Sequence, residues 1–408
     1  MKNISKNLKS ELNKVMISLE DISEDDFYVY QPREDSDMLL QSTRQKIKQL
    51  NKSLKILELG VGSGYIAFNL ISEFDNLDYH AVDLNPDAVN FVKKYYQKSK
   101  FKSKLTVKQS DLFENVKGKY DIIIFNPPYL PKQKNEPYKM SLALSGGTLG
   151  HETTEKFLQQ ARKFLKKNGI MQIIVTSLNA KYLKPIIERE LFQYKTIKEE
   201  KYDFEKLYVY ELEQDDLAKK YPDIQVFAEG WHSYIYRYDK YIIKKSKLND
   251  ARYQKEKMML QRLSKYNIGP KIVDLGLDDN YLCYEFVPGI LLKDYMKDLT
   301  LEKIKQINKI LLPKIIRLDS LGIKKEELTR ITSNAIINKN KITLIDFERS
   351  KFTKTNDNFP QYLEFIRHLL SRLKLNPKIV DLKEYKKLEN DYDLLLEKAK
   401  LIMNNYAL

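Results

Sequence analysis

The residues with the clearest chemical potential stand in one run, Asn126-Pro127-Pro128-Tyr129, directly after the apolar stretch Ile122–Phe125. The Asn126 side-chain carbonyl and the Pro127 backbone carbonyl could each accept one N–H bond of an NH₂ group, while Tyr129 packs on its flat face. An amide or exocyclic amine nitrogen is a poor nucleophile because its lone pair is delocalised. The run therefore favours transfer to an NH₂ nitrogen, with positioning as the main source of catalysis.

Two classes of acceptor meet this description, the side-chain amide of a protein glutamine and the exocyclic amine of a nucleobase. The run alone leaves that choice open. The net charge of +15 would suit a nucleic acid or ribosomal partner through counterion release, and it would equally suit solvated lysines in a Lys-rich composition.

The cofactor is indicated by a glycine-rich turn and two aspartates. Glycines just after a strand let the backbone turn sharply and approach a ligand closely. Asp83 ends the second expected strand, where a carboxylate can accept hydrogen bonds from both ribose hydroxyls, and Asp111 follows the third, near an adenine. With the Asn126–Tyr129 run after the fourth strand, this order indicates an S-adenosylmethionine site. The glycines alternate along the turn: Gly60, Gly62 and Gly64.

The elements that must position these residues alternate between strand and helix, which predicts a parallel sheet with crossover helices. We expect helices over residues 1–26, from the glycine-rich turn through Ile71, and over Thr153–Lys166. The pair Tyr194–Lys201 and Leu207–Glu211 would close the sheet as a hairpin. The other expected strands are Ile56–Leu59, Tyr79–Val82, Leu105–Val107, Asp121–Phe125 and Ile170–Thr176.

A chain of 408 residues suits two domains, and the polar segment Glu213–Pro222 places them at 1–212 and 213–408. In the second domain a strand-rich lobe precedes a helix-rich lobe, which makes it an α+β domain. Its expected elements are strands at Tyr234–Tyr238, Tyr241–Lys244 and near Ile272 and Tyr281, a helix over Ala251–Lys265, and then mostly helix interrupted by Lys341–Asp346.

Several classes of protein are excluded. A single cysteine, Cys283, cannot build a disulfide scaffold, a zinc ribbon or an iron–sulfur cluster. None of the four histidines has a metal-binding spacing, and no serine-nucleophile signature is present. No window approaches about 18 uninterrupted apolar residues, and the N-terminal lysines have no apolar region behind them. We therefore expect a soluble cytoplasmic protein without a membrane partner.

Three segments resemble a known family: Val29–Ser36, Asn126–Tyr129 and Leu144–Glu152. They look like the HemK/PrmC-type glutamine methyltransferases that modify the Gly-Gly-Gln loop of peptide-chain release factors, over about residues 27–212. So few residues precede Val29 that the likeness is to the short archaeal and eukaryotic branch. Members of that branch often work with a small zinc-binding activator subunit.

That resemblance implies a Rossmann-like class I methyltransferase domain in which Asn126, Pro127 and Tyr129 form the catalytic run. The family usually has Thr where Ser36 stands, and the hydroxyl is kept. The residues that the resemblance places around S-adenosylmethionine are Ser36, Glu58, Gly60, Gly62, Asp83, Leu84, Asp111 and Leu112.

The second domain offers Lys244 at the end of a strand, Glu256 in the following helix and Asp346 after another strand. Such a lysine–glutamate pair can hold nucleotide phosphates, and such an aspartate can hold Mg²⁺. The order resembles the small kinase-like proteins of archaea near the RIO kinases, with Tyr284–Gly289 as the hinge. The resemblance implies an ATP site with Mg²⁺ on Asp346, formed by Lys244, Glu256, Glu285 and Asp346.

Departures from the kinase pattern limit this second resemblance. Lys325-Glu326-Glu327 stands where a kinase has His-x-Asp, and Asn334 lies seven residues after Glu327 instead of five. We therefore expect nucleotide binding with phosphotransfer near background, or a non-catalytic module that brings the enzyme to its substrate. The whole chain is interpreted as a glutamine methyltransferase fused to a kinase-like domain. The alternative is a nucleic-acid N6-adenine methyltransferase with a basic binding domain.

Overall fold

The computed structural model describes residues 32–134, 137–247, 251–375, 379–406 and 408. The chain forms two compact units, Met1–Asp223 and Ile224–Leu408, each described by itself. The division lies 11 residues after the predicted boundary between residues 212 and 213, just past the polar segment Glu213–Pro222. The reason is that β9 runs to Gln214 and the short helix α8 (Asp216–Lys220) still belongs to unit 1. The helix expected over residues 1–26 lies outside the described residues.

Unit 1 is built on a seven-stranded sheet with the order β3-β2-β1-β4-β7-β9-β8. The strands β1 to β4 and β7 pair in parallel, whereas β9 is antiparallel to both β7 and β8, which confirms the expected parallel sheet and closing hairpin. The strands are β1 (Leu54–Leu59), β2 (Leu77–Asp83), β3 (Lys104–Gln109), β4 (Tyr120–Phe125), β7 (Leu165–Thr176), β8 (Phe192–Lys201) and β9 (Lys206–Gln214).

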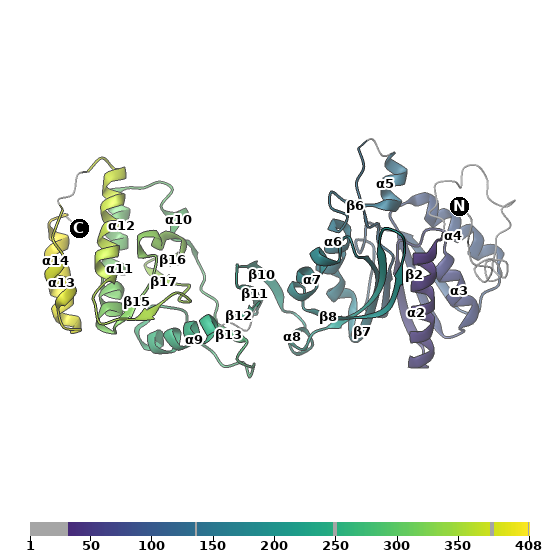
Figure 1. Cartoon of the computed structure of the whole chain (residues 1–408), viewed down its shortest axis with the longest axis horizontal. Coiled ribbons are helices and arrows are strands. Elements are labelled where there is room, and N and C mark those ends of the chain that lie inside the picture. The colour runs from purple at the N-terminus through teal and green to yellow at the C-terminus, as the bar shows by residue number, and fades with distance from the viewer. Residues whose placement is uncertain (1–31, 135–136, 248–250, 376–378, 407) are drawn as a thin grey trace. The chain divides into compact units, whose positions relative to one another are not determined.

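Helices cover both faces of this sheet (Figure 1). On one face lie α2 (Glu34–Leu50), α3 (Tyr65–Glu73) and α4 (Pro86–Lys98), whose apolar residues share one core with β1 to β3. On the other face lie α6 (Glu152–Ala161) and α7 (Ala180–Arg189). The helix expected over Thr153–Lys166 is wrong at its end, because a 3₁₀ turn (Arg162–Phe164) follows α6 and Leu165 already belongs to β7.

Helix α2 was not expected from the sequence, and a buried polar network fixes it to the sheet. Thr43 Oγ1 donates to Gln172 Oε1 at 2.8 Å, and Gln172 Nε2 donates to Glu211 Oε2 at 3.0 Å. Lys46 pairs with the other Glu211 oxygen at 2.8 Å. These contacts join α2 to β7 and β9, so the first turn of α2 has a defined place relative to the sheet.

The parallel strands bring the predicted site together at one edge of the sheet. Leu59 of β1 is in register with Val82 of β2 and with Phe125 of β4. The turn after β1, Asp83 and Asn126 therefore start from the same edge. This is where the strand order reverses direction, between β1 and β4, the place where open α/β sheets form ligand-binding crevices.

Unit 2 begins with a four-stranded antiparallel sheet, β10 (Gln225–Glu229), β11 (Ser233–Tyr238), β12 (Tyr241–Ser246) and β13 (Tyr281–Glu285). Helix α9 (Ala251–Leu263) follows β12 and continues as a 3₁₀ turn (Ser264–Tyr266). The remaining helices are α10 (Leu292–Tyr295), α11 (Leu301–Ser320), α12 (Asn358–Arg372), α13 (Lys383–Lys387) and α14 (Tyr392–Asn404).

The expected order of a strand-rich part before a helix-rich part is present in unit 2, but the second part holds more strands than expected. Three strands, β14 (Ile290–Leu291), β16 (Ala335–Asn338) and β17 (Lys341–Leu344), form one small sheet, and β15 (Ile323–Lys324) pairs with β18 (Lys351–Phe352). Strands of two to four residues carry too little alternation to be seen in a sequence. Among the described residues of the whole chain, none of the helices is long and apolar enough to span a bilayer.

Candidate active site

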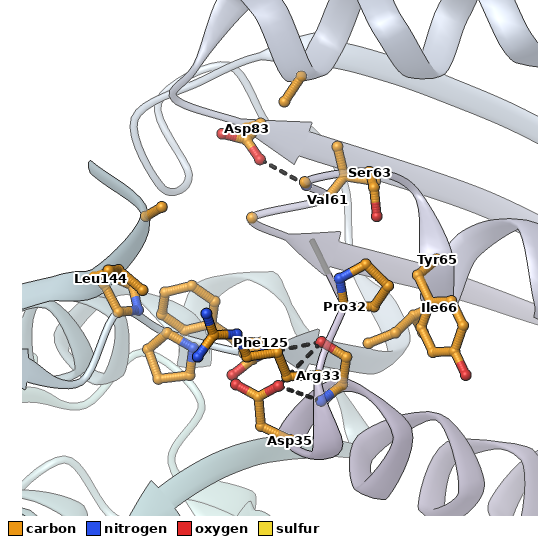
Figure 2. A pocket seen from close by; sticks show the side chains of 18 of the residues that line it. Pro32, Arg33, Asp35, Val61, Ser63, Tyr65, Ile66, Asp83, Phe125 and Leu144 are labelled. Atoms are coloured by element: carbon orange, nitrogen blue, oxygen red, sulfur yellow. Dashed lines mark hydrogen bonds between the residues drawn. The ribbon is translucent and has the colours of Figure 1, made fainter. Parts of the chain in front are cut away.

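A cavity of about 230 Å³ opens at the edge of the sheet where β1, β2 and β4 end (Figure 2). Asp83 lies on one side of it, and Arg33 and Asp35 from the start of α2 lie on the other. The structure places most of the predicted site residues in its lining: Ser36, Glu58, Gly60, Gly62, Asp83, Leu84, Asn126, Pro127 and Tyr129.

The glycine-rich turn and Asp83 form one rigid unit. Gly60 and Gly62 have φ angles of 67° and 51°, a conformation that favours glycine. Gly62 N donates to Asp83 Oδ2 at 2.9 Å, and Asn85 N donates to Asp83 Oδ1 at 2.8 Å. Burial raises the pKa of the Asp83 carboxyl, although these backbone N–H groups lower it in part. Each oxygen keeps a lone pair for a ligand hydroxyl, as a ribose-binding carboxylate requires.

Glu58 lies behind this turn as a neutral group. Its side chain is buried and accepts a hydrogen bond from Tyr79 OH at 2.8 Å. Burial raises the pKa of Glu58 from an ordinary 4.5 to about 8, the hydrogen bond from Tyr79 opposes that rise, and the nearby charge of Asp83 adds to it. At neutral pH Glu58 therefore holds its proton, and it adds no negative charge to the cavity.

Two side chains, those of Asp35 and Ser36, orient the predicted catalytic asparagine. The buried carboxylate of Asp35 accepts from Ser36 Oγ at 3.3 Å through Oδ1. Ser36 Oγ in turn accepts from Asn126 Nδ2 at 3.4 Å. Because the single hydroxyl hydrogen of Ser36 points at a group that only accepts, its oxygen is left to accept from the amide nitrogen of Asn126. The carbonyl end of Asn126 is thereby the free end.

That free end has no partner within the described part of the chain: Asn126 Oδ1 is buried without a hydrogen bond. A buried acceptor in this state is the atom that a substrate N–H would satisfy. Tyr129 OH donates to the second oxygen of Asp35, Oδ2, at 3.2 Å. Asp35 therefore fixes both Asn126 and Tyr129, the first and last residues of the catalytic run.

Two of the predicted cofactor residues do not line the cavity. Asp111 is exposed, and Leu112, with a φ of 45°, is half-buried. Their turn lies beside the site, because Ser110 N donates to the Asp83 carbonyl at 2.9 Å. The placement of Asp111 at an adenine remains a prediction. The cavity also includes Arg33 and Asp35, which lie in the family-like segment Val29–Ser36 but were given no role from the sequence. Glu205 lines the cavity as well, and no motif in the sequence pointed to it.

In unit 2 the structure joins three of the four residues predicted for a nucleotide site. Lys244 Nζ pairs with Glu256 Oε2 at 2.6 Å, both side chains being buried, and lies 3.8 Å from Glu348. The other Glu256 oxygen accepts from Phe347 N at 3.1 Å, which ties the Asp346 segment to α9. Burial lowers the pKa of Lys244, but Glu256 and the other nearby carboxylates raise it, so it stands above its ordinary value.

Glu285, the fourth residue, is half-exposed at the end of β13 and pairs with Lys271 at 3.3 Å. Lys325 is buried, and its ammonium donates to the carbonyls of Ile345, at 2.9 Å, and Asp346. Burial lowers the pKa of Lys325 to about 8, against the opposing effect of Asp346. No group of three or more His, Cys, Asp or Glu side chains gathers as a metal site among the described residues.

Comparison with known proteins places unit 1. The family model "Methyltransferase small domain" matches residues 34–206. A putative protein N5-glutamine methyltransferase of Methanocaldococcus jannaschii is 38% identical over 152 residues, 37% of this chain and 73% of that protein. The release factor glutamine methyltransferase of Aquifex aeolicus is 33% identical over 178 residues, 41% of this chain and 62% of that protein. The ribosomal protein uL3 glutamine methyltransferase of Francisella tularensis is 29% identical over 143 residues, 33% of this chain and 45% of that protein.

The strand order, the glycine turn with Asp83 and the family match define unit 1 as a Rossmann-like class I methyltransferase domain. The chain belongs to the family of protein N5-glutamine methyltransferases. It is an S-adenosylmethionine-dependent N-methyltransferase. The residues that the family model matches, 34–206, lie within unit 1.

Asn126 is assigned to the acceptor amide and Asp83 to the cofactor, so their alanine variants should have different defects. Asn126→Ala removes the buried acceptor and should abolish methyl transfer while leaving S-adenosylmethionine affinity largely intact. Asp83→Ala also releases the Gly62 N–H and should weaken cofactor binding by about 1 to 3 kcal/mol. Calorimetric titration of both variants decides, and equal loss of cofactor affinity in the two would contradict the assignment.

The raised pKa of Glu58 predicts how stability depends on pH. The folded protein keeps this proton at pH values where the unfolded chain has lost it, so the free energy of unfolding falls as pH rises from 4.5 toward about 8. The slope is at most about 1.4 kcal/mol per pH unit. Glu58→Gln removes this fall. Urea unfolding of the cofactor-free protein between pH 5 and 8 tests this pH dependence, and Glu114→Gln, at an exposed position, is the control. If the free energy of unfolding changes with pH in the same way in the wild type and in Glu58→Gln, the prediction is refuted.

Proposed function

We propose that unit 1 transfers the methyl group of S-adenosylmethionine to the side-chain amide nitrogen of a glutamine in a peptide-chain release factor. The observation that carries the proposal is the unpartnered Asn126 Oδ1, held facing away from Ser36. It would accept one N–H of the glutamine amide, and the Pro127 carbonyl would accept the other. The methyl donor supplies an electrophilic carbon when bound. The amide proton leaves after transfer, so no base is required at this step.

The release factor as substrate is supported by the names of relatives and by the resemblance of Val29–Ser36 and Leu144–Glu152. A glutamine of a ribosomal protein is the nearest alternative within the same chemistry, because the relative from Francisella tularensis is named for it. Nucleic-acid N6-adenine methylation is not favoured, since the relatives compared are named for protein glutamine. A small zinc-binding activator subunit and a ribosomal partner remain predictions from the resemblance and the charge.

A side-by-side labelling assay tests this substrate. Tritiated S-adenosylmethionine is offered with a release factor, ribosomal protein uL3, DNA and tRNA. We expect label on the release factor alone, and none when the glutamine of its Gly-Gly-Gln loop is replaced by another residue. Continued labelling of that variant, or stronger labelling of adenine in DNA, would contradict the proposal.

A second function is favoured by one contact in unit 2, and we propose that this unit binds a nucleotide in a kinase-like site. Lys244 is held by Glu256 at 2.6 Å, an arrangement that presents a fixed ammonium to phosphate oxygens. Asp346 would hold Mg²⁺ from the turn next to it. Phosphotransfer should be near background, because Glu327 stands where an aspartate base is needed and is engaged by Arg349 at 2.6 Å.

Nucleotide binding by the full-length chain is the measurable consequence. Lys244→Met should weaken binding of ATP with Mg²⁺ by about tenfold or more, since a charge-assisted contact is lost. Lys245→Met, on the next residue of β12, is the matched control and should change it less than about twofold. If nucleotides cause no thermal shift in the wild type, the nucleotide site is refuted and unit 2 has a docking role instead. Robust autophosphorylation lost in Glu327→Gln would show that this glutamate is a working base.

A further inference from the structure

The cavity of unit 1 holds a second buried acceptor without a donor, Glu205. It lies in the turn between β8 and β9, which is closed by a hydrogen bond from Tyr202 N to the Glu205 carbonyl at 2.8 Å. The side chain lines the same cavity as Asn126. Within the described residues, Glu205 Oε2 is buried and has no hydrogen-bond partner, the same state as Asn126 Oδ1.

The electrostatic surroundings place Glu205 beside the catalytic run. Burial and the charge of Asp35 raise the pKa of the Tyr129 phenol, and the charge of Glu205 adds to this rise. Tyr129 belongs to the run that holds the methyl acceptor. The neighbouring Phe204 exposes 96% of its surface, so an apolar side chain stands next to Glu205 at the protein surface.

The chemistry of a carboxylate discriminates between the two acceptor classes. An ionised carboxylate only accepts hydrogen bonds. Adenine held by its exocyclic amine carries N1 and N7 close to that amine, and both are acceptors, so either would be repelled by Glu205. A glutamine within a polypeptide brings main-chain N–H donors instead. Asn126 and Pro127 account for the two amide hydrogens, which leaves a main-chain N–H for Glu205.

We propose that Glu205 determines substrate specificity by accepting a main-chain N–H of the acceptor polypeptide next to the methylated glutamine. This inference rests on the proposed glutamine methylation and names the contact that selects a polypeptide over adenine. No proton is transferred to Glu205, whose effect is confined to binding and orientation.

Steady-state methylation of a release factor tests the contact. Glu205→Ala should raise KM by about 10- to 100-fold, with S-adenosylmethionine affinity and the thermal unfolding midpoint unchanged. Glu205→Gln keeps an acceptor oxygen and should lose less. Asp203→Asn, an exposed carboxylate in the same turn, is the matched control and should stay within about twofold of wild type.

Peptides identify the partner atom. In a Gly-Gly-Gln peptide the main-chain N–H of the preceding glycine, of the glutamine and of the following residue is replaced, one at a time, by an ester oxygen. One ester should lower kcat/KM of the wild type by about the factor seen in Glu205→Ala and should have no further effect in that variant. Additive effects for all three esters, or Glu205→Ala within about twofold of wild type, would overturn the inference.

The two proposals fail in different ways. If the wild-type enzyme methylates no glutamine and instead labels a nucleobase, the proposed function itself is wrong. That nucleobase could be adenine or guanine, and guanine has an N1–H that could donate to Glu205. If it methylates glutamine while Glu205→Ala has unchanged kinetics, the inference about Glu205 alone is wrong.

Discussion

The buried carboxylate of Asp35 is the constraint on which the acceptor side of the site depends. Because it can only accept hydrogen bonds, the hydroxyls of Ser36 and Tyr129 must both donate to it. The Ser36 oxygen is then left to accept from Asn126 Nδ2, and the carbonyl end of Asn126 is the end that can meet a substrate. The Asp35 carboxylate thus sets the direction of the hydrogen bonds that link it through Ser36 to Asn126, the residue that would hold the substrate NH₂ group.

Two parts of the fold supply this site, and each is fixed by its own contacts. The cofactor side is part of the sheet, since Asp83 at the end of β2 binds the turn after β1. The acceptor side is brought by α2, which a buried network through Gln172 holds against β7 and β9. A helix outside the strand–turn–helix pattern therefore determines the geometry of the reacting amide. Burial raises the pKa of Glu58 to about 8, so Asp83 is the carboxylate that binds the glycine turn through the Gly62 N–H.

The sequence predicted what the sheet alone determines and missed what the packing of other elements determines. The apolar run Ile122–Phe125 marked a central strand, and the ends of the strands placed Asp83 and Asn126 together. Helix α2 was not predicted because its buried face carries the polar residues Ser42 and Thr43, which weaken the helical period of apolar residues. Glu205 was not predicted as a site residue because it stands in a polar turn of the sequence. Only the folded hairpin of β8 and β9 brings it to the cavity. In unit 2 the sequence showed Lys325 only as a departure from the kinase pattern, and the fold alone shows that its ammonium donates to the main-chain carbonyls of Ile345 and Asp346.

The most direct measurement is the single-turnover rate of methyl transfer by Asp35→Asn at saturating S-adenosylmethionine. The amide that replaces the carboxylate can donate to the Ser36 oxygen, which frees the Ser36 hydrogen. The Asn126 amide can then turn over so that its Oδ1 accepts from Ser36, and the acceptor that the substrate needs is lost. The account predicts a rate at least about tenfold lower than wild type, with unchanged cofactor affinity and thermal unfolding midpoint. A rate within about threefold of wild type would contradict the claim that Asp35 orients the catalytic asparagine.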